Sequence, residues 1–168
     1  NDIPQSIYVC VAIGDSPASF TLINTEESKY ESLSDNYKKV MLSFGNERYL
    51  KSRKRIIDEA KRLNIFDDCL IETETVYEED KFKEIKNKVK ISWFNQPRGG
   101  GWYIWKPYII YKHLQNLNEG DILFYCDSGM QIHNNEIVKS KFYKLFDMVR
   151  DISICPTSII TFITTGCE

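Results

Sequence analysis

Short apolar runs alternate with amphipathic segments along this chain. The run at residues 122–126 ("ILFYC") has no polar alternation, which is typical of a strand buried on both faces of a parallel sheet, and residues 39–44 ("KVMLSF") predict a short apolar strand. Residues 7–13 ("IYVCVAI") and 18–24 ("ASFTLIN") predict two strands joined by the turn "GDSP". Further strands are predicted at 69–73 ("CLIET"), at 90–94 ("KISWF") and, one or two of them, after residue 150.

The amphipathic segments predict helices between these strands. Residues 47–63 and 78–90 carry apolar side chains at steps of three and four, and Asn46 is a suitable N-cap for the first of these segments. Pro107 suits the first position of a third helix, which is predicted to begin there and to extend to Leu117. A fourth helix is predicted around residues 142–149. The alternation of strands and helices predicts an α/β fold with a mostly parallel central sheet flanked by helices.

Two of the short apolar strands predict where a ligand site lies. In parallel α/β sheets, ligands bind just beyond the carboxyl ends of the strands. We therefore expect residues 39–44 and 122–126 to be neighbouring or near-neighbouring parallel strands. Ser43 and Asp127, at their carboxyl ends, are then expected to open into the same cleft.

Composition narrows the class of protein. The 168 residues are 42% apolar and 27% charged, which fits one globular domain over residues 1–168, or a domain of a longer protein. The 22 basic and 24 acidic side chains give a net charge of -2 and are mostly interspersed, so no nucleic-acid partner is expected. The basic run "KSRKR" at 51–55 is interpreted as the solvated face of a helix. No run reaches the roughly 18 to 20 apolar residues of a membrane-spanning segment.

Cysteine usage favours a reducing compartment. The five cysteines stand at long, irregular spacings, mostly inside apolar runs, and none forms a C-x-x-C pair. That pattern predicts buried, reduced thiols instead of a disulfide framework or a zinc site. A cytoplasmic location follows as an expectation.

The stretch "RGGGWYIWKP" at residues 98–107 is the main candidate for ligand binding. It combines glycines, two tryptophans, two cations and a proline, a mixture that suits neither a buried core segment nor a plain linker. Within and just after it, Trp105, Tyr108 and Tyr111 lie at helical spacing and are expected to pack in the core. Trp102 is equally suited to the core and to ligand contact.

Three segments together resemble a glycosyltransferase family. They are "SFGNERYLKSRKRIIDEAKRLNIFDD", "RGGGWYIWKP" and "LNEGDILFYCDSG", which lie within residues 39–135. The chain is similar there to sugar-nucleotide-dependent glycosyltransferases with an R-G-x-G-[YW]-[YW]-x-W-K-P block and a D-x-D-related motif, found in bacterial surface-polysaccharide systems and large DNA viruses. The resemblance implies a glycosyltransferase-A, Rossmann-like fold. Residues 1–38 are an extension outside it.

This resemblance implies chemistry for individual residues. Sugar transfer develops negative charge on the leaving diphosphate, which Lys106 and Arg98 would neutralise. Asp127 either binds a divalent cation, Mn²⁺ or Mg²⁺, or accepts hydrogen bonds from ribose hydroxyls; the triplet Asp-Ser-Gly lacks a second carboxylate, so metal dependence stays open. The catalytic candidates are Asp127 and Lys106. The donor-binding candidates are Ser43, Phe44, Gly45, Arg98, Gly99, Gly100, Trp102, Trp105, Lys106, Asp127, Ser128 and Gly129.

Two functions follow as alternatives. The first is an enzyme that transfers a sugar from a nucleoside diphosphate sugar to a glycan or other acceptor. The second is a non-catalytic module that binds a nucleotide sugar or a glycan on the same scaffold. The donor sugar, the acceptor and the stereochemical outcome are open at this point.

Overall fold

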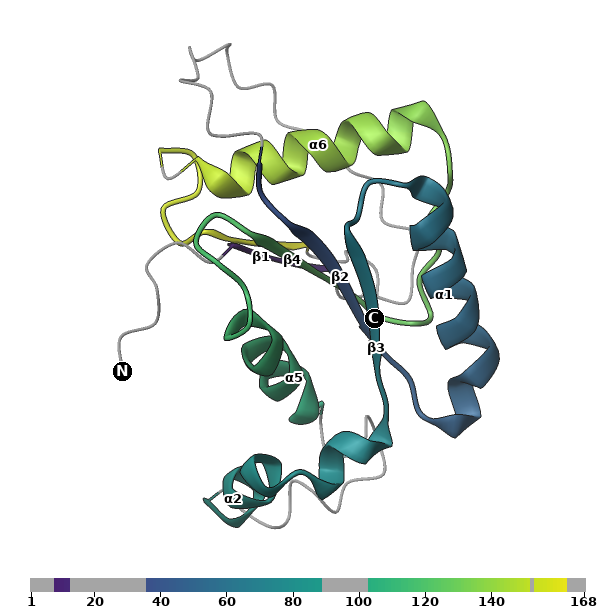
Figure 1. The fold of residues 1–168 in the computed structure, drawn as a ribbon, viewed down its shortest axis with the longest axis vertical. Coiled ribbons are helices and arrows are strands. Elements are labelled where there is room, and N and C mark those ends of the chain that lie inside the picture. Colours follow the sequence, from purple (N-terminus) through teal and green to yellow (C-terminus); the bar gives the residue numbers. More distant parts are fainter. Residues whose placement is uncertain (1–7, 13–35, 89–102, 152, 163–168) are drawn as a thin grey trace, which may run out of the picture.

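A parallel sheet forms the centre of the molecule in the computed structural model, which describes residues 8–12, 36–88, 103–151 and 153–162 (Figure 1). Its strand order is β3-β2-β4-β1-β5, and every pair of neighbouring strands is parallel. The described strands are β1 (Tyr8–Ala12), β2 (Lys39–Phe44), β3 (Asp68–Glu72), β4 (Ile122–Cys126) and β5 (Ile159–Phe162). This arrangement confirms the α/β class and the parallel sheet.

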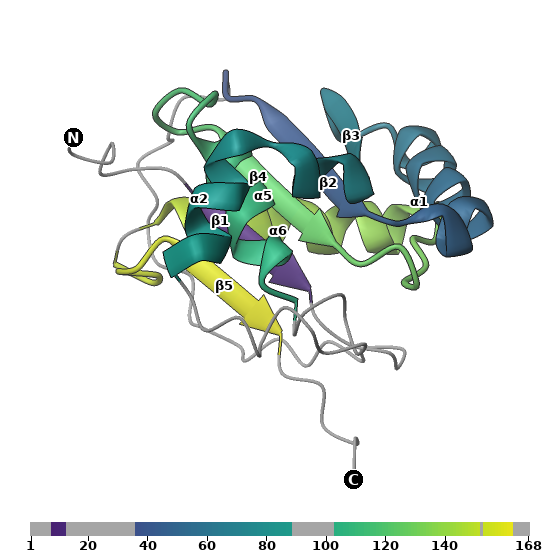
Figure 2. The same cartoon turned by 90° about the horizontal axis from the view of Figure 1, so that it is seen from below.

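Helices cover both faces of the sheet. On one face lie α1 (Leu50–Leu63) and α6 (Glu136–Arg150), and on the other lie α2 (Asp80–Lys88) and α5 (Trp105–Leu114) (Figures 1 and 2). Two short 3-10 helices, η1 (Glu47–Tyr49) and η2 (Glu74–Glu78), follow β2 and β3.

Each face of the sheet has its own hydrophobic core. Successive strand residues point to opposite faces, so Met41 and Phe124 pack toward α1 and α6 while Leu42 and Tyr125 pack toward α5. All four side chains are almost completely buried. Unbroken apolar runs are therefore what these central strands require, because neither face meets water.

The connections after β2 and β4 run in opposite directions. β2 leads through α1 to β3 at one edge of the sheet, whereas β4 leads through α6 to β5 at the other edge. Because β2 and β4 are hydrogen-bonded neighbours, their carboxyl ends flank a point where the chain diverges. Such a point is where open α/β sheets form a ligand crevice.

Most predicted elements are present, with shifted ends. The strand at 39–44 has the predicted bounds, and β3 begins one residue early. α5 begins at Trp105 and ends at Leu114, so Pro107 lies in its first turn, where a missing amide proton costs no intrahelical bond. Asn46 occupies the N-cap position of η1, but its side chain makes no capping hydrogen bond. The predicted strands at 18–24 and 90–94 lie outside the described residues.

Burial confirms two of three predicted core aromatics. Trp105 and Tyr108 are buried, but Tyr111 is 47% exposed, so its predicted place in the core is wrong. The buried positions of α5 are Trp105, Lys106, Tyr108 and Ile109, and Tyr111 lies outside this set. Cys126 and Cys155 are buried and Cys69 is partly exposed, and all three are free thiols. Of the helices described, none has the length and apolar character needed to cross a membrane.

Candidate functional site

An ion pair between Lys106 and Asp127 joins the two motifs singled out in the sequence. Lys106 stands in the first turn of α5, and Asp127 directly follows β4. The Lys106 Nζ atom lies 3.0 Å from Asp127 Oδ1 and 3.1 Å from Asp127 Oδ2. The Lys106 side chain is 10% exposed and that of Asp127 is 30% exposed, so only the carboxylate side of the pair is open to water.

Aromatic side chains surround this pair. The Tyr125 hydroxyl donates a 2.6 Å hydrogen bond to Asp127 Oδ1. Burial, together with the negative charge of Asp127, raises the pKa of Tyr125 far above its ordinary value, so the phenol remains a donor. The rings of Tyr103, Trp105 and Tyr125 lie 5.2, 5.8 and 5.1 Å from Lys106 Nζ, within the range of cation–π attraction. The ammonium is thus held by one carboxylate and three rings.

Gly45 brings the end of β2 against the loop after β4. A Cβ at this position would lie 3.1 Å from Arg53 Cβ and 3.4 Å from Ser128 Oγ, which is too tight for a larger side chain without movement. The Gly45 amide donates to Glu72 O, at the end of β3, over 3.1 Å. The carboxyl ends of β2, β3 and β4 therefore meet, and Gly45 and Asp127 lie on the same edge as predicted.

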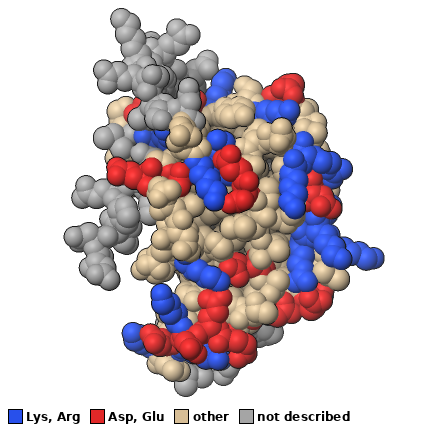
Figure 3. Space-filling view, in the orientation of Figure 1, with Lys and Arg blue, Asp and Glu red and all other residues tan. Residues whose placement is uncertain are grey.

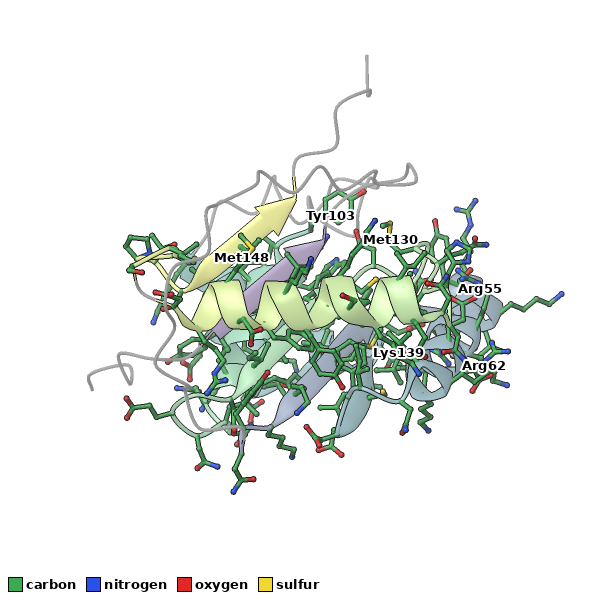
Figure 4. The ribbon with its side chains drawn as sticks, turned by 90° about the horizontal axis from the view of Figure 1, so that it is seen from above. Arg55, Arg62, Tyr103, Met130, Lys139 and Met148 are labelled. Carbon is green, nitrogen blue, oxygen red and sulfur yellow. The ribbon has the colours of Figure 1, made fainter. Side chains whose placement is uncertain are left out.

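Two arginines of the basic run stabilise this edge. Arg53 donates to Gly45 O at 2.9 Å, and Arg55 donates to Ser128 O and Met130 O at 3.1 and 2.8 Å. Figure 4 labels Arg55, which projects from α1, and Met130, which lies in the loop after β4. Interpreting this run as a solvated face was wrong for these two residues.

A signal for Arg53 was present in the sequence. It lies three residues before Ile56 and seven before Ala60, so it belongs to the stripe of α1 that faces the core. Arg55 is off that stripe. It reaches the β4 loop because Glu59, its i+4 partner, also accepts from the Ile132 amide at 2.8 Å.

Several predicted donor-binding residues are buried instead of lining a cleft. Ser43 is completely buried with no hydrogen-bond partner for its Oγ among the described residues, so it does not open to solvent. Phe44 and Trp105 stack on each other, with ring centroids 3.7 Å apart, and are 9% and 4% exposed. Ser128 is buried, whereas Gly129 is exposed with nothing within 4 Å of a Cβ. Arg98, Gly99, Gly100 and Trp102 lie outside the described residues.

A charged network fixes α5 from the other end. Lys112 pairs with Glu72 and Glu79 at 2.9 and 2.6 Å, and His113 Nε2 lies 2.7 Å from Glu72. The hydrogen bond with His113 is the main cause of a lowered pKa for Glu72. Burial and a 2.6 Å hydrogen bond to Glu79 raise the pKa of Tyr108 to about 12. These contacts tie α5 to β3 and η2, and so position the turn that carries Lys106.

The described residues around Asp127 do not form a divalent-cation site. Both oxygens of the Asp127 carboxylate are engaged, by Lys106 and Tyr125. Within the described part of the chain, no group of three or more His, Cys, Asp or Glu side chains is placed to hold a metal ion.

Surface charge is mixed around the site. On the face drawn in Figure 3, acidic and basic side chains are interspersed, with many of the basic ones along α1 on the right.

Comparison of the chain with protein-family models, with curated proteins and with solved structures finds no match. The resemblance to glycosyltransferases therefore stays a prediction.

Proposed function

We propose that the chain binds a nucleoside diphosphate sugar at the carboxyl ends of β2 and β4 and transfers the sugar to a glycan or other acceptor on a glycosyltransferase-A-like scaffold. The observation that carries the proposal is the Lys106–Asp127 pair. It joins residues of the two most specific motifs, beside the point where the connections of two neighbouring strands diverge. A buried lysine held at such a point is suited to meet an anionic group.

Lys106 has the principal electrostatic role in this proposal. Negative charge grows on the diphosphate as the sugar leaves, so a fixed ammonium stabilises the transition state more than the bound donor. Asp127 orients that ammonium, and its exposed side can accept hydrogen bonds from ribose hydroxyls. Arg98 would add a second cation, and Gly99 and Gly100 would let the backbone approach the phosphates.

The first turn of α5 would contribute to phosphate binding through the helix dipole more than through its backbone amides. The Lys106 amide already donates to Tyr103 O at 2.9 Å, and Pro107 has no amide proton. Phosphate binding at this helix end therefore depends on side chains such as Lys106, assisted by the positive end of the helix. Phe44 and Trp105 support the turn by stacking beneath it and are proposed as scaffold, not as platforms for the sugar.

The proposal is tested with a panel of nucleoside diphosphate sugars, by measuring binding and slow hydrolysis with and without Mn²⁺. We expect at least one donor to bind and to be hydrolysed, and we expect Lys106→Ala to lower turnover more than donor affinity. Lys139→Ala, which breaks the Lys139–Glu136 pair on α6, is the matched control and should change neither quantity.

The outcomes separate the two candidate functions. Binding of no donor by the wild-type protein would refute both. Binding without any hydrolysis would instead select the non-catalytic module.

A further inference from the structure

Asp127 has little capacity left for a metal ion. Its Oδ1 accepts the Tyr125 hydroxyl at 2.6 Å and lies 3.0 Å from Lys106 Nζ, while Oδ2 accepts from the same ammonium at 3.1 Å. A carboxylate offers about four lone-pair positions, of which three are used here. Calcium and magnesium ions take six or more oxygen ligands, so a metal ion bound here would have one position on Asp127 and would depend on water and phosphate oxygens for the rest.

The ammonium already occupies the place of a carboxylate-bound cation. Lys106 is 8% exposed, and the stack of its neighbour Trp105 on Phe44 fixes the helical turn from which it projects. Three aromatic rings complete its surroundings. A second cation brought to Asp127 would lie within a few ångströms of this fixed positive charge and be repelled by it.

We propose that Lys106 takes the place of a divalent cation in this site, so that the chain binds its nucleoside diphosphate without a metal ion. The inference rests on the proposed function and specifies which group supplies the positive charge at the same site. An ammonium has three donor protons, and the two oxygens of Asp127 can accept at most two of them in this arrangement. At least one is not taken up by Asp127 and is proposed to donate to a phosphate oxygen that approaches the ammonium.

The test is calorimetry with four probes, UDP, GDP, ADP and CDP, in buffer with EDTA and in buffer with Mn²⁺. For a diphosphate that binds, we expect the wild-type dissociation constants in the two buffers to agree within about twofold. Lys106→Met should weaken binding in EDTA by more than about tenfold, equivalent to about 1.4 kcal/mol. Mn²⁺ should restore part of this loss, because Asp127 is then free to hold the metal with the diphosphate.

Two further variants keep the test independent of folding defects. Lys106→Arg retains a cation and should bind in EDTA far better than Lys106→Met. Lys139→Met removes a lysine paired with Glu136 on α6 and should bind like the wild type in both buffers. Melting temperatures of all variants identify any that fail to fold.

The possible outcomes distinguish a failure of the inference from a failure of the proposed function. A wild-type affinity that falls more than about tenfold in EDTA overturns the inference and leaves the proposed function standing. Unchanged affinity of Lys106→Met in EDTA also overturns it. Saturable binding of Mn²⁺ alone to the wild-type protein, lost in Asp127→Asn, does the same whether or not a diphosphate binds. Failure of every diphosphate and every nucleotide sugar to bind overturns the proposed function, and the inference with it.

Discussion

Replacing Asp127 by Ala should destabilise the fold more than replacing Lys106 by Met, although both changes break the same ion pair. The two partners are unequally buried, with side chains 30% and 10% exposed. In Asp127→Ala the ammonium stays buried, and the partners that remain for it among the described residues are aromatic rings. In Lys106→Met the carboxylate keeps the Tyr125 hydroxyl and its access to water.

The expected magnitudes follow from this asymmetry. Removing one partner of a fully buried pair costs about 3–5 kcal/mol, whereas exposed pairs contribute about 0–1 kcal/mol. The open carboxylate side and a cation–π attraction of about 1 kcal/mol reduce the first figure to about 2–3 kcal/mol for Asp127→Ala. Lys106→Met should cost about 1 kcal/mol, because the charge left behind is partly solvated. The double variant should cost less than the sum of the two.

Urea unfolding of the wild type, the two single variants and the double variant measures these free energies as a double-mutant cycle. We expect a coupling of about 1–2 kcal/mol between Lys106 and Asp127. Lys139→Met, which breaks the more exposed pair with Glu136, should change stability by less than about 0.5 kcal/mol. Additivity within about 0.5 kcal/mol, or a larger loss for Lys106→Met than for Asp127→Ala, would refute the reasoning.

Gly45→Ala should lower stability by about 1–3 kcal/mol, because the new Cβ would lie 3.1 Å from Arg53 Cβ, whereas Gly129→Ala should be nearly neutral in the same thermal melt. Equal effects at the two glycines would contradict this. The free energy of unfolding should also depend on Tyr108 at alkaline pH. Its pKa is raised from 10.0 to about 12, so the native state holds the proton more tightly; this contribution is complete below pH 10 and is lost between about pH 10 and 12. Tyr108→Phe should remove that part of the decline, and parallel pH curves for the two proteins would show that the contact with Glu79 is not responsible.

The central strands were predictable because their burial leaves a strong local pattern. Residues 39–44 and 122–126 are buried on both faces of the sheet, and the structure gives both strands the predicted bounds. Their parallel pairing and the common edge of Gly45 and Asp127 follow from the general behaviour of parallel sheets. The order of all the strands depends on tertiary packing and has no local signal, so it was not predictable.

The site was only partly predictable because polar groups act through partners far away in the sequence. Asp127 and Lys106 were predicted as site residues, but nothing local indicates that they pair with each other. Arg55 was taken for a solvated residue because its acceptors, Ser128 O and Met130 O, lie in a loop more than seventy residues later. Ser43 was expected to face a cleft, yet the alternation of β2 points it into the sheet–helix interface, where it is buried.

The place of β1 in the sheet has a consequence for biosynthesis. Tyr8 pairs with Ile122, and Val9 pairs with both Leu123 and Ile159, so the first strand of the sheet lies between two strands that the ribosome makes much later. The β2–β3 pair is formed by strands close together in the sequence and can form early, whereas β1 cannot pair until β4 has been synthesised. During that interval the apolar segment "YVCVA" has no partner strand from its own sheet. Production of the protein in cells should therefore be sensitive to chaperones that shield an unpaired, aggregation-prone strand.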